Sequence, residues 1–185
     1  MTYANPHYLV DTDWLASHLS EPNLRIYDCT THLIHQDEPA LPGPYRVQSG
    51  LEDYLKAHIP GAAFIDLQGT LSDPESELRF TCSESDSLIR AFATLGIGDE
   101  SQVILYSQTS PQWATRIWWL LRIAGFDSAS VLNGGLTNWK LEQRVVTDQQ
   151  TAYPAAQLTT KPRTGLMASK DDVLNAINDS TACTI

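Results

Sequence analysis

Cysteine is scarce in this 185-residue chain, and the three that occur, Cys29, Cys82 and Cys183, lie far apart. The sequence contains no Cys-x-x-Cys pair and no Cys/His spacing typical of a zinc site. An odd number of widely spaced cysteines does not form a disulfide framework. We therefore expect a protein of the reducing cytoplasm, without a structural metal.

Long apolar runs and clustered basic residues are also missing. No apolar stretch is long enough to span a bilayer, and the N-terminal segment MTYANPHYLVDTDW lacks the basic and apolar regions of a signal peptide. The 12 Lys and Arg face 22 Asp and Glu, which gives a formal charge of −10. We therefore expect no binding to nucleic acid or to a membrane. A local basic pocket could still hold a small anion.

The chain does contain enough apolar residues, 42%, for a packed core. Short apolar runs alternate with segments of helical periodicity, which predicts an α/β sheet that is mostly parallel and covered on both faces. Residues 30–50, rich in proline and glycine, and residues 68–83 are predicted to be loops. Strands are predicted at 9–10, 24–27, 62–66, 103–106 and 130–132, and helices at 11–19, 51–58, 86–96, 113–124 and 136–143.

Polar residues stand at the carboxyl ends of three of the predicted strands, at Asp28, Asp66 and Ser107. Ligands of parallel sheets bind beyond the carboxyl ends of the strands. In VILYSQTSPQWATR (103–116), a strand, a polar loop and a helix N-terminus follow one another, an arrangement suited to an anion or a nucleophile. However, the loop SQTSPQ carries no Lys or Arg, no His is near in sequence to act as a base, and Pro111 lacks an N–H.

The last part of the chain suggests an internal repeat. Residues 147–164 have no apolar periodicity and are predicted to be a linker. Residues 165–185 then repeat the order of residues 9–28, with an apolar pair, a capped helix, a polar turn and an apolar strand. We expect the chain to be a truncated piece of a two-domain protein. The alternative is an ordinary C-terminal helix and strand with chance similarity.

Two motifs connect the chain with a known family. The stretch AHIPGAAFID (57–66) resembles the first signature of rhodanese-like domains, and LNGGLTNW (132–139) resembles the second. RIWWLLRIAGF (116–126) and LGIGDES (95–101) resemble the first of the two domains of thiosulfate and 3-mercaptopyruvate sulfurtransferases. The resemblance implies a three-layer α/β/α rhodanese-like domain with a mostly parallel five-stranded sheet over residues 1–146, and the start of a second, truncated domain at residues 165–185.

The resemblance also implies a chemistry. Rhodaneses carry sulfane sulfur as a cysteine persulfide, and Ser107 occupies the position of that cysteine. Because a serine hydroxyl cannot form a persulfide, the resemblance implies that this domain is inactive and that the catalytic cysteine lies in the second domain. The parent protein is expected to move sulfur from thiosulfate or 3-mercaptopyruvate to a thiol or cyanide acceptor. No metal or organic cofactor is implied.

Neither Cys29 nor Cys82 is expected to replace the missing catalytic cysteine. Cys29 has His32 and His35 close in sequence, but it lies in the wrong loop for the family and is expected to be buried. Cys82 lies near Glu84 and Asp86, which we expect to raise the pKa of its thiol.

The family places its active cleft between the two domains. Motif order assigns four residues of this chain to the cleft wall: Thr31, Asp66, Gln112 and Trp113. The expected partners are the second rhodanese-like domain and a small sulfur-donor anion. Without that domain, the exposed face near Trp113 is expected to promote self-association of the fragment.

Several positions depart from the family pattern, which leaves an alternative open. The family often has aromatic residues at the places of Thr31 and Gln112, and a Gly and a Pro at those of Gln143 and Val145. Mercaptopyruvate-type members often have a His at about Phe80. The alternative is a non-enzymatic interaction or regulatory module. A related phosphatase is disfavoured, because no cysteine is followed by Arg at the Cys-x5-Arg spacing.

Overall fold

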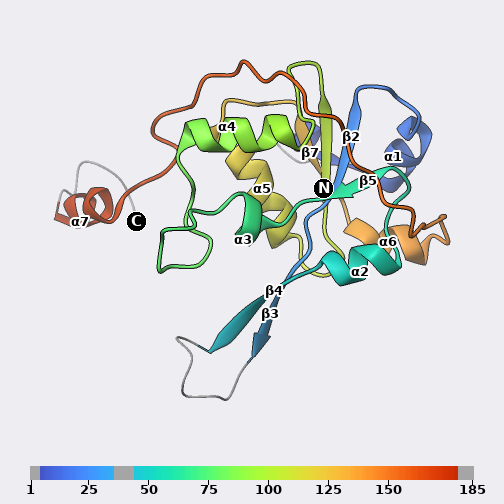
Figure 1. The fold of residues 1–185 in the computed structure, drawn as a ribbon, viewed down its shortest axis with the longest axis horizontal. Coiled ribbons are helices and arrows are strands. Elements are labelled where there is room, and N and C mark those ends of the chain that lie inside the picture. The colour runs from blue at the N-terminus through green and yellow to red at the C-terminus, as the bar shows by residue number, and fades with distance from the viewer. Residues whose placement is uncertain (1–4, 36–43, 179–185) are drawn as a thin grey trace.

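The computed structural model describes residues 5–35 and 44–178. Its centre is a five-stranded sheet, which confirms the predicted mostly parallel sheet, and all five strands are parallel. The strand order places β6 and β2 near the middle of the sheet, so their carboxyl ends lie side by side (Figure 1). In spatial order the strands are β1 (Leu9–Val10), β7 (Ala129–Leu132), β6 (Gln102–Tyr106), β2 (Leu24–Asp28) and β5 (Ala62–Phe64).

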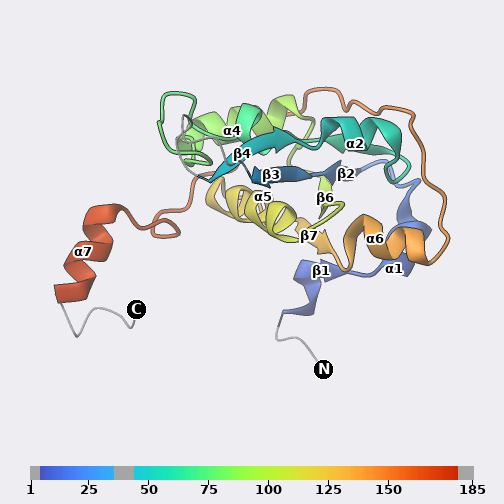
Figure 2. The ribbon, with the colours of Figure 1, turned by 90° about the horizontal axis from the view of Figure 1, so that it is seen from below.

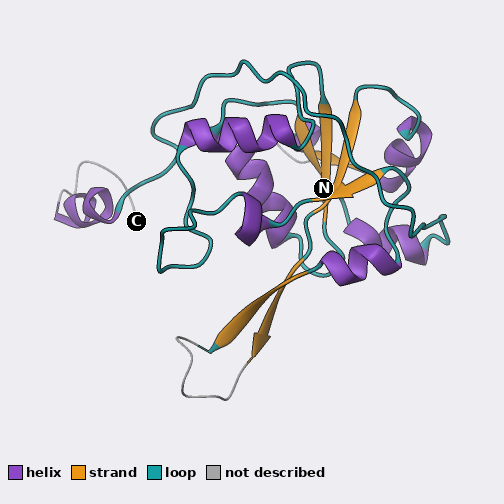
Figure 3. Cartoon of the chain, viewed as in Figure 1, coloured by secondary structure: helices purple, strands orange, loops and turns teal. Residues whose placement is uncertain are grey.

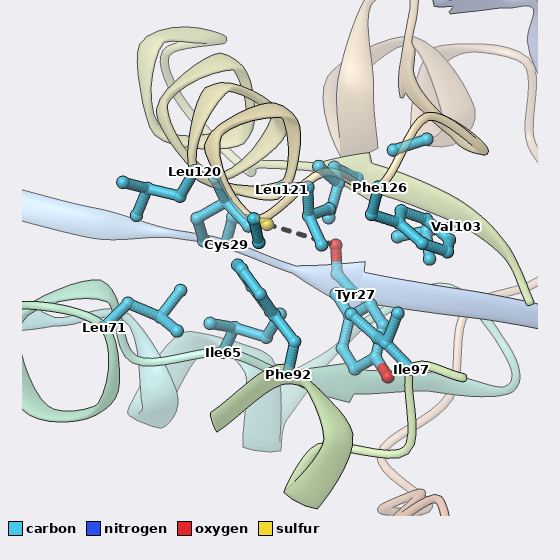
Figure 4. Packing of buried hydrophobic residues seen from close by; sticks show 14 of the residues in the cluster. Tyr27, Cys29, Ile65, Leu71, Phe92, Ile97, Val103, Leu120, Leu121 and Phe126 are labelled. Carbon is cyan, nitrogen blue, oxygen red and sulfur yellow. Dashed lines mark hydrogen bonds between the residues drawn. The ribbon is translucent and has the colours of Figure 1, made fainter. Parts of the chain in front are cut away.

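Helices cover both faces of the sheet (Figures 1 and 3). On one face, α4 (Ser85–Thr94) and α5 (Gln112–Ile123) bury the larger apolar cluster, which includes Tyr27 and Phe92 (Figure 4). On the other, α1 (Thr12–His18) and α6 (Gly135–Leu141) contribute Leu15, Leu136 and Trp139 to a second cluster. This two-sided burial explains why the strands are continuous apolar runs.

A two-stranded hairpin replaces most of the loop predicted for residues 30–50. β3 (Thr31–His35) and β4 (Tyr45–Ser49) pair antiparallel, with Thr31 opposite Ser49. The prediction was wrong because Pro39, Pro42, Gly43 and Pro44 all fall between the two strands, while THLIH and YRVQS carry residues that favour strands. We call this hairpin the arm, because it projects away from the sheet, beyond the short helix α2 (Leu51–Lys56) (Figure 1).

The loop predicted for residues 68–83 also contains a short helix, α3 (Leu67–Thr70). Asp66 begins it, since the Asp66 carboxylate accepts a hydrogen bond from the Gly69 N–H at 3.0 Å. A single turn of helix has no apolar periodicity, so only this capping residue could have revealed it.

Residues 147–164 form no helix, and they lie along the surface of the domain instead of hanging free (Figure 2). We call this segment the strap. Its first residue, Thr147, exchanges two backbone hydrogen bonds with His58, of 2.8 and 2.9 Å. Further along, the Tyr153 hydroxyl donates to the Gly61 carbonyl at 2.7 Å, and Leu158 is buried in the core. Proline and polar residues therefore mark a segment without secondary structure, although it is packed on the domain.

The tail contains the helix that the repeat predicted. Ser169 begins α7 (Lys170–Asn178), because its side chain and that of Asp172 cap each other's backbone N–H groups. The preceding pair, Leu166–Met167, forms a bend, and the predicted strand at Thr184–Ile185 lies outside the described residues. None of the helices within the described ranges is long and apolar enough to cross a bilayer.

Candidate functional site

The loop from Ser107 to Pro111 connects the carboxyl end of β6 to the N-terminus of α5, as the sequence predicted. Ser107 is 6% exposed, and its hydroxyl donates to the Ser110 carbonyl within the same loop. The Ser107 carbonyl accepts from the Leu136 N–H at 3.3 Å, at the start of α6. A Cβ on Gly135 would lie 2.5 Å from that carbonyl, so only glycine permits this approach.

A buried carboxylate holds this loop against the neighbouring strand. Asp28, the last residue of β2, is fully buried and accepts from the Gln108 side-chain amide and from the Thr30 N–H, each at 2.9 Å. The Thr30 hydroxyl also donates to Asp28 and accepts from the Gln108 N–H at 2.9 Å. Burial raises the pKa of Asp28, and the bonds from Thr30 and Gln108 partly oppose this shift.

Beside the loop lies a cavity of about 340 Å³. Its lining combines hydroxyl and amide groups with apolar side chains, and it contains no charged side chain and no His. A small anion would therefore meet neither a cation nor a titratable base there. The lining residues are Leu9, Ser107, Thr109, Pro111, Ala114, Thr115, Val131, Leu132, Asn133, Gly134, Gly135 and Thr137.

The four residues predicted for a cleft wall all follow the carboxyl ends of β2, β5 and β6, which are neighbouring strands. Thr31 is 3% exposed, and its hydroxyl oxygen has no hydrogen-bond partner within the described structure. Asp66 caps α3, and Gln112 is the exposed first residue of α5. Trp113 is 7% exposed. Of these four residues, Asp66 and Gln112 therefore have polar groups that are at least partly exposed, and the cleft itself stays a prediction.

Phe80 is a contact of Trp113 that the sequence did not reveal. The centroids of the two rings lie 5.4 Å apart, and Phe80 has a φ of +59°, which is unfavourable for a bulky residue. Two hydrogen bonds hold it there: its N–H donates to the Gln68 side chain at 2.9 Å, and its carbonyl accepts from Arg116 at 3.0 Å. Such a backbone outlier depends on tertiary contacts, so no local motif predicts it.

The described cysteines are unsuited to nucleophilic chemistry. Cys29 is fully buried among apolar side chains, with its thiol donating to the Tyr27 carbonyl at 3.6 Å (Figure 4). Burial, and secondarily the charge of Asp28, raises the pKa of the Cys29 thiol. Burial also raises the pKa of Cys82, against the lowering effect of Arg116. The predicted direction for Cys82 is confirmed, but the cause is burial and not Glu84 or Asp86. Cys183 lies outside the described residues.

An α/β sheet with its strand-to-helix loop on this edge defines a fold class, and comparison with known proteins identifies the family. A protein-family model, that of the rhodanese-like domain, matches residues 11–142 of this chain. The chain therefore belongs to the rhodanese-like domain family, and the resemblance seen in the two sequence motifs is confirmed.

Two relatives show which members the chain is similar to. It is 28% identical over 175 residues to a 3-mercaptopyruvate sulfurtransferase of Escherichia coli, a match that covers 95% of this chain and 59% of the relative. It is 30% identical over 178 residues to the sulfur carrier protein TtuD of Thermus thermophilus, covering 96% of this chain and 55% of the relative. The chain thus spans somewhat more than half the length of these relatives.

The crystal structure of the 3-mercaptopyruvate sulfurtransferase SseA from Escherichia coli has the same fold. It superimposes with a TM-score of 0.77 at 28% identity, over 95% of this chain and 63% of that chain. The chain is therefore a rhodanese-like relative of the sulfurtransferases, built on a five-stranded parallel sheet flanked by helices.

Proposed function

We propose that this chain is the N-terminal, non-catalytic domain of a two-domain sulfurtransferase. The complete protein would move sulfane sulfur from thiosulfate or 3-mercaptopyruvate to a thiol or cyanide acceptor, with its catalytic cysteine in a second rhodanese-like domain. The observation that carries the proposal is Ser107, which stands at the start of the strand-to-helix loop where the family has its cysteine. The names of the relatives support the reaction, and their greater length supports the second domain.

The loop chemistry supports the inactive role. Persulfide formation requires a thiolate, which a helix N-terminus and nearby cations stabilise. Here the hydroxyl of Ser107 is engaged by Ser110, the adjoining cavity has no cation in its lining, and the buried Cys29 has a raised thiol pKa. The side chains of this domain would then serve as structural support and as part of a cleft wall at Thr31, Asp66, Gln112 and Trp113.

A second candidate is a non-enzymatic interaction or regulatory module. The departures from the family pattern at Thr31, Gln112, Gln143 and Val145 favour it. Under this hypothesis, the complete protein would transfer no sulfur either.

A sulfurtransferase assay separates the two candidates. Thiosulfate and 3-mercaptopyruvate are each supplied with cyanide or a thiol, to the 185-residue chain and to the product of the complete reading frame. Activity in the longer product alone supports the proposal. Activity in the short chain that disappears in Cys29→Ser would move the catalytic thiol to Cys29 and refute it. Absence of transfer in both forms favours the interaction module.

A further inference from the structure

His58, which belongs to the motif AHIPGAAFID, is fully buried, and both of its ring nitrogens face carbonyl oxygens. Nδ1 lies 2.6 Å from the Tyr54 carbonyl oxygen, and Nε2 lies 3.0 Å from the Gln149 carbonyl oxygen of the strap. Because a carbonyl oxygen only accepts hydrogen bonds, both ring nitrogens have to donate. A neutral imidazole has one N–H and the imidazolium has two, so this arrangement requires the charged ring.

The ring of Tyr54 also favours the charged form of His58. The two rings are stacked, with centroids 3.9 Å apart and planes inclined by 16°. The face of an aromatic ring attracts a cation that lies over it. Burial opposes the charge, because it removes the water that would solvate the ring. The two carbonyl oxygens and the Tyr54 ring replace that water, so the strap supplies part of what stabilises the imidazolium.

His18 shows which of the two hydrogen bonds is local. Its Nδ1 lies 2.6 Å from the Trp14 carbonyl oxygen, four residues earlier, and its ring stacks on Trp14 at 4.0 Å and 14°. His58 has the same arrangement on Tyr54, also four residues earlier. At His18, however, Nε2 faces an exposed carboxylate at 3.8 Å and has no contact with the strap. The Nδ1 bond therefore forms without the strap, and a neutral His58 would keep its proton on Nδ1 and lose the bond to Gln149.

The first residues of the strap depend on His58 and Tyr54 for their attachment. Within the described residues, the hydrogen bonds from Thr147–Thr151 to the rest of the domain all go to these two: the backbone pair at Thr147, the Gln149 carbonyl, and the Thr151 N–H, which donates to the Tyr54 hydroxyl at 3.1 Å. The strap is fixed differently further along. The N–H groups of residues 156 and 163 donate to backbone carbonyls at 2.9 and 2.8 Å, with no titratable side chain involved.

Other titratable groups surround this contact. Burial raises the pKa of Tyr54 and of Tyr106, which comes from β6, so both hydroxyls stay neutral in the range where histidine changes charge. Asp28, from β2, contacts Tyr106, and burial raises the pKa of its carboxyl. Asp148 of the strap is exposed. Asp28 is therefore the group whose titration has to be separated from that of His58.

We propose that His58 is a proton-dependent latch for the strap: its imidazolium holds residues 147–151 through the Gln149 carbonyl, and loss of its proton releases them. Because only the charged ring donates to Gln149, protonation and attachment stabilise each other. Attachment is therefore strongest at low pH and weakens as the pH rises. The proposal is independent of the proposed function, because every group in it belongs to this chain.

Amide hydrogen exchange of the 185-residue chain tests the latch at about pH 5.5 and about pH 8.5, which bracket the range in which histidine changes charge. Protection factors, taken relative to the intrinsic exchange rate at each pH, remove the direct effect of pH. We expect protection of the Thr147 and Thr151 amides to fall at least about tenfold at the higher pH, and that of the Ala156 and Arg163 amides to change less than about twofold. No fall at the first two, or an equal fall at all four, would overturn the proposal.

Heteronuclear NMR of the histidine rings observes the proton itself in the unmodified chain, so this test does not depend on a variant that folds. At about pH 5.5 both ring nitrogens of His58 should carry a proton, and at about pH 8.5 only Nδ1 should do so. A ring with the same charge at both pH values would overturn the proposal.

Substitutions identify the titrating group. His58→Gln removes the ring, so protection of the Thr147 and Thr151 amides should no longer depend on pH. His18→Gln is the matched control, since it removes a histidine with the same local geometry and no contact with the strap, and it should leave the pH dependence unchanged. Asp28→Asn should also leave it unchanged. If Asp28→Asn abolishes the pH dependence, the titrating group is Asp28 and the latch is refuted.

Discussion

The side-chain amide of Gln108 donates to the Asp28 carboxylate over 2.9 Å, and this bond joins the loop after β6 to the end of β2. Asp28 is fully buried, so the bond is shielded from water. The loop that begins at Ser107 is therefore held in a fixed position against the end of β2.

Replacement of Asp28 by Asn should lower the free energy of unfolding by about 1–3 kcal/mol. In Asn, an NH2 group replaces one carboxylate oxygen. A hydrogen-bond donor then faces the N–H donor of Thr30 or of Gln108, and one hydrogen bond is lost. Urea denaturation measures the loss. The double variant Asp28→Asn with Gln108→Glu restores a donor–acceptor pair and should be less destabilised than the sum of the two single variants. Strict additivity would show that the two side chains are not coupled.

The raised pKa of Asp28 predicts a pH dependence. A carboxyl whose pKa is raised by folding binds a proton more readily in the folded state. Its contribution to stability is therefore full below the unfolded pKa, about 3.9, and is lost as the pH rises through the folded value. The stability difference between the wild type and Asp28→Asn should thus shrink from pH 4 upward. A difference that widens over that range would contradict burial as the dominant cause.

Thr30 and Thr31 form a matched pair of adjacent buried threonines. The Thr30 hydroxyl bonds both Asp28 and the Gln108 N–H, so Thr30→Val should cost about 1–3 kcal/mol. The Thr31 hydroxyl has no partner in the described structure, so Thr31→Val should be neutral or stabilising. Thermal unfolding of both variants provides the comparison. Equal losses would mean that the Thr31 hydroxyl is in fact bonded.

A cysteine introduced at position 107 should not give this chain sulfurtransferase activity. In the 185-residue chain, Ser107→Cys places a thiol where no cationic side chain lines the cavity and Pro111 offers no N–H. We expect slow alkylation by iodoacetamide at pH 7, and no persulfide after incubation with thiosulfate, as measured by intact mass. A background in which Cys29, Cys82 and Cys183 are all replaced by Ser leaves the introduced thiol as the one that intact mass reports. Rapid persulfide formation would show that the cysteine is the only catalytic element missing.

Alanine substitutions at Gly125 and Gly61 distinguish the stability lost to backbone strain from the stability lost when the strap is displaced. Both have positive φ, +85° and +80°, so Ala at either position should cost about 1–2 kcal/mol. At Gly125, a Cβ would also lie 2.1 Å from the Lys161 carbonyl of the strap, whereas nothing lies within 4 Å at Gly61. Gly125→Ala should therefore lose more stability and expose the strap to proteolysis. Equal losses would show that strap packing adds nothing at this point.

The elements that the sequence predicted best were those in which burial determines the pattern of apolar and polar residues. The strands around Ile104 and Ile26 are continuous apolar runs because helices cover both faces of the sheet, and the placement of Asp28 beside Ser107–Gln108 follows from parallel topology. The arm was missed because it has few neighbours, so no burial pattern marks it, while the prolines between its strands dominated the interpretation.

Features set by distant contacts were the hardest to predict. Phe80 takes its unusual backbone conformation through Gln68 and Arg116, and the buried hydroxyl of Thr31 depends on how the arm leaves β2. The strap likewise contacts the domain through single residues, such as Tyr153, that follow no period. None of these contacts is local in sequence.

The strap gives the domain a definite mechanical connection to whatever follows it. Because it is hydrogen-bonded in succession at His58, Gly61, Ala93, Asp99 and Ile123, a pull applied at α7 acts first on Arg163, whose N–H donates to the Ile123 carbonyl. The remaining hydrogen bonds of the strap would then open one at a time, from its carboxyl end toward its amino end, before any strand of the sheet bears the load. We therefore expect tension applied at α7 to load the contacts of the strap before those of the sheet.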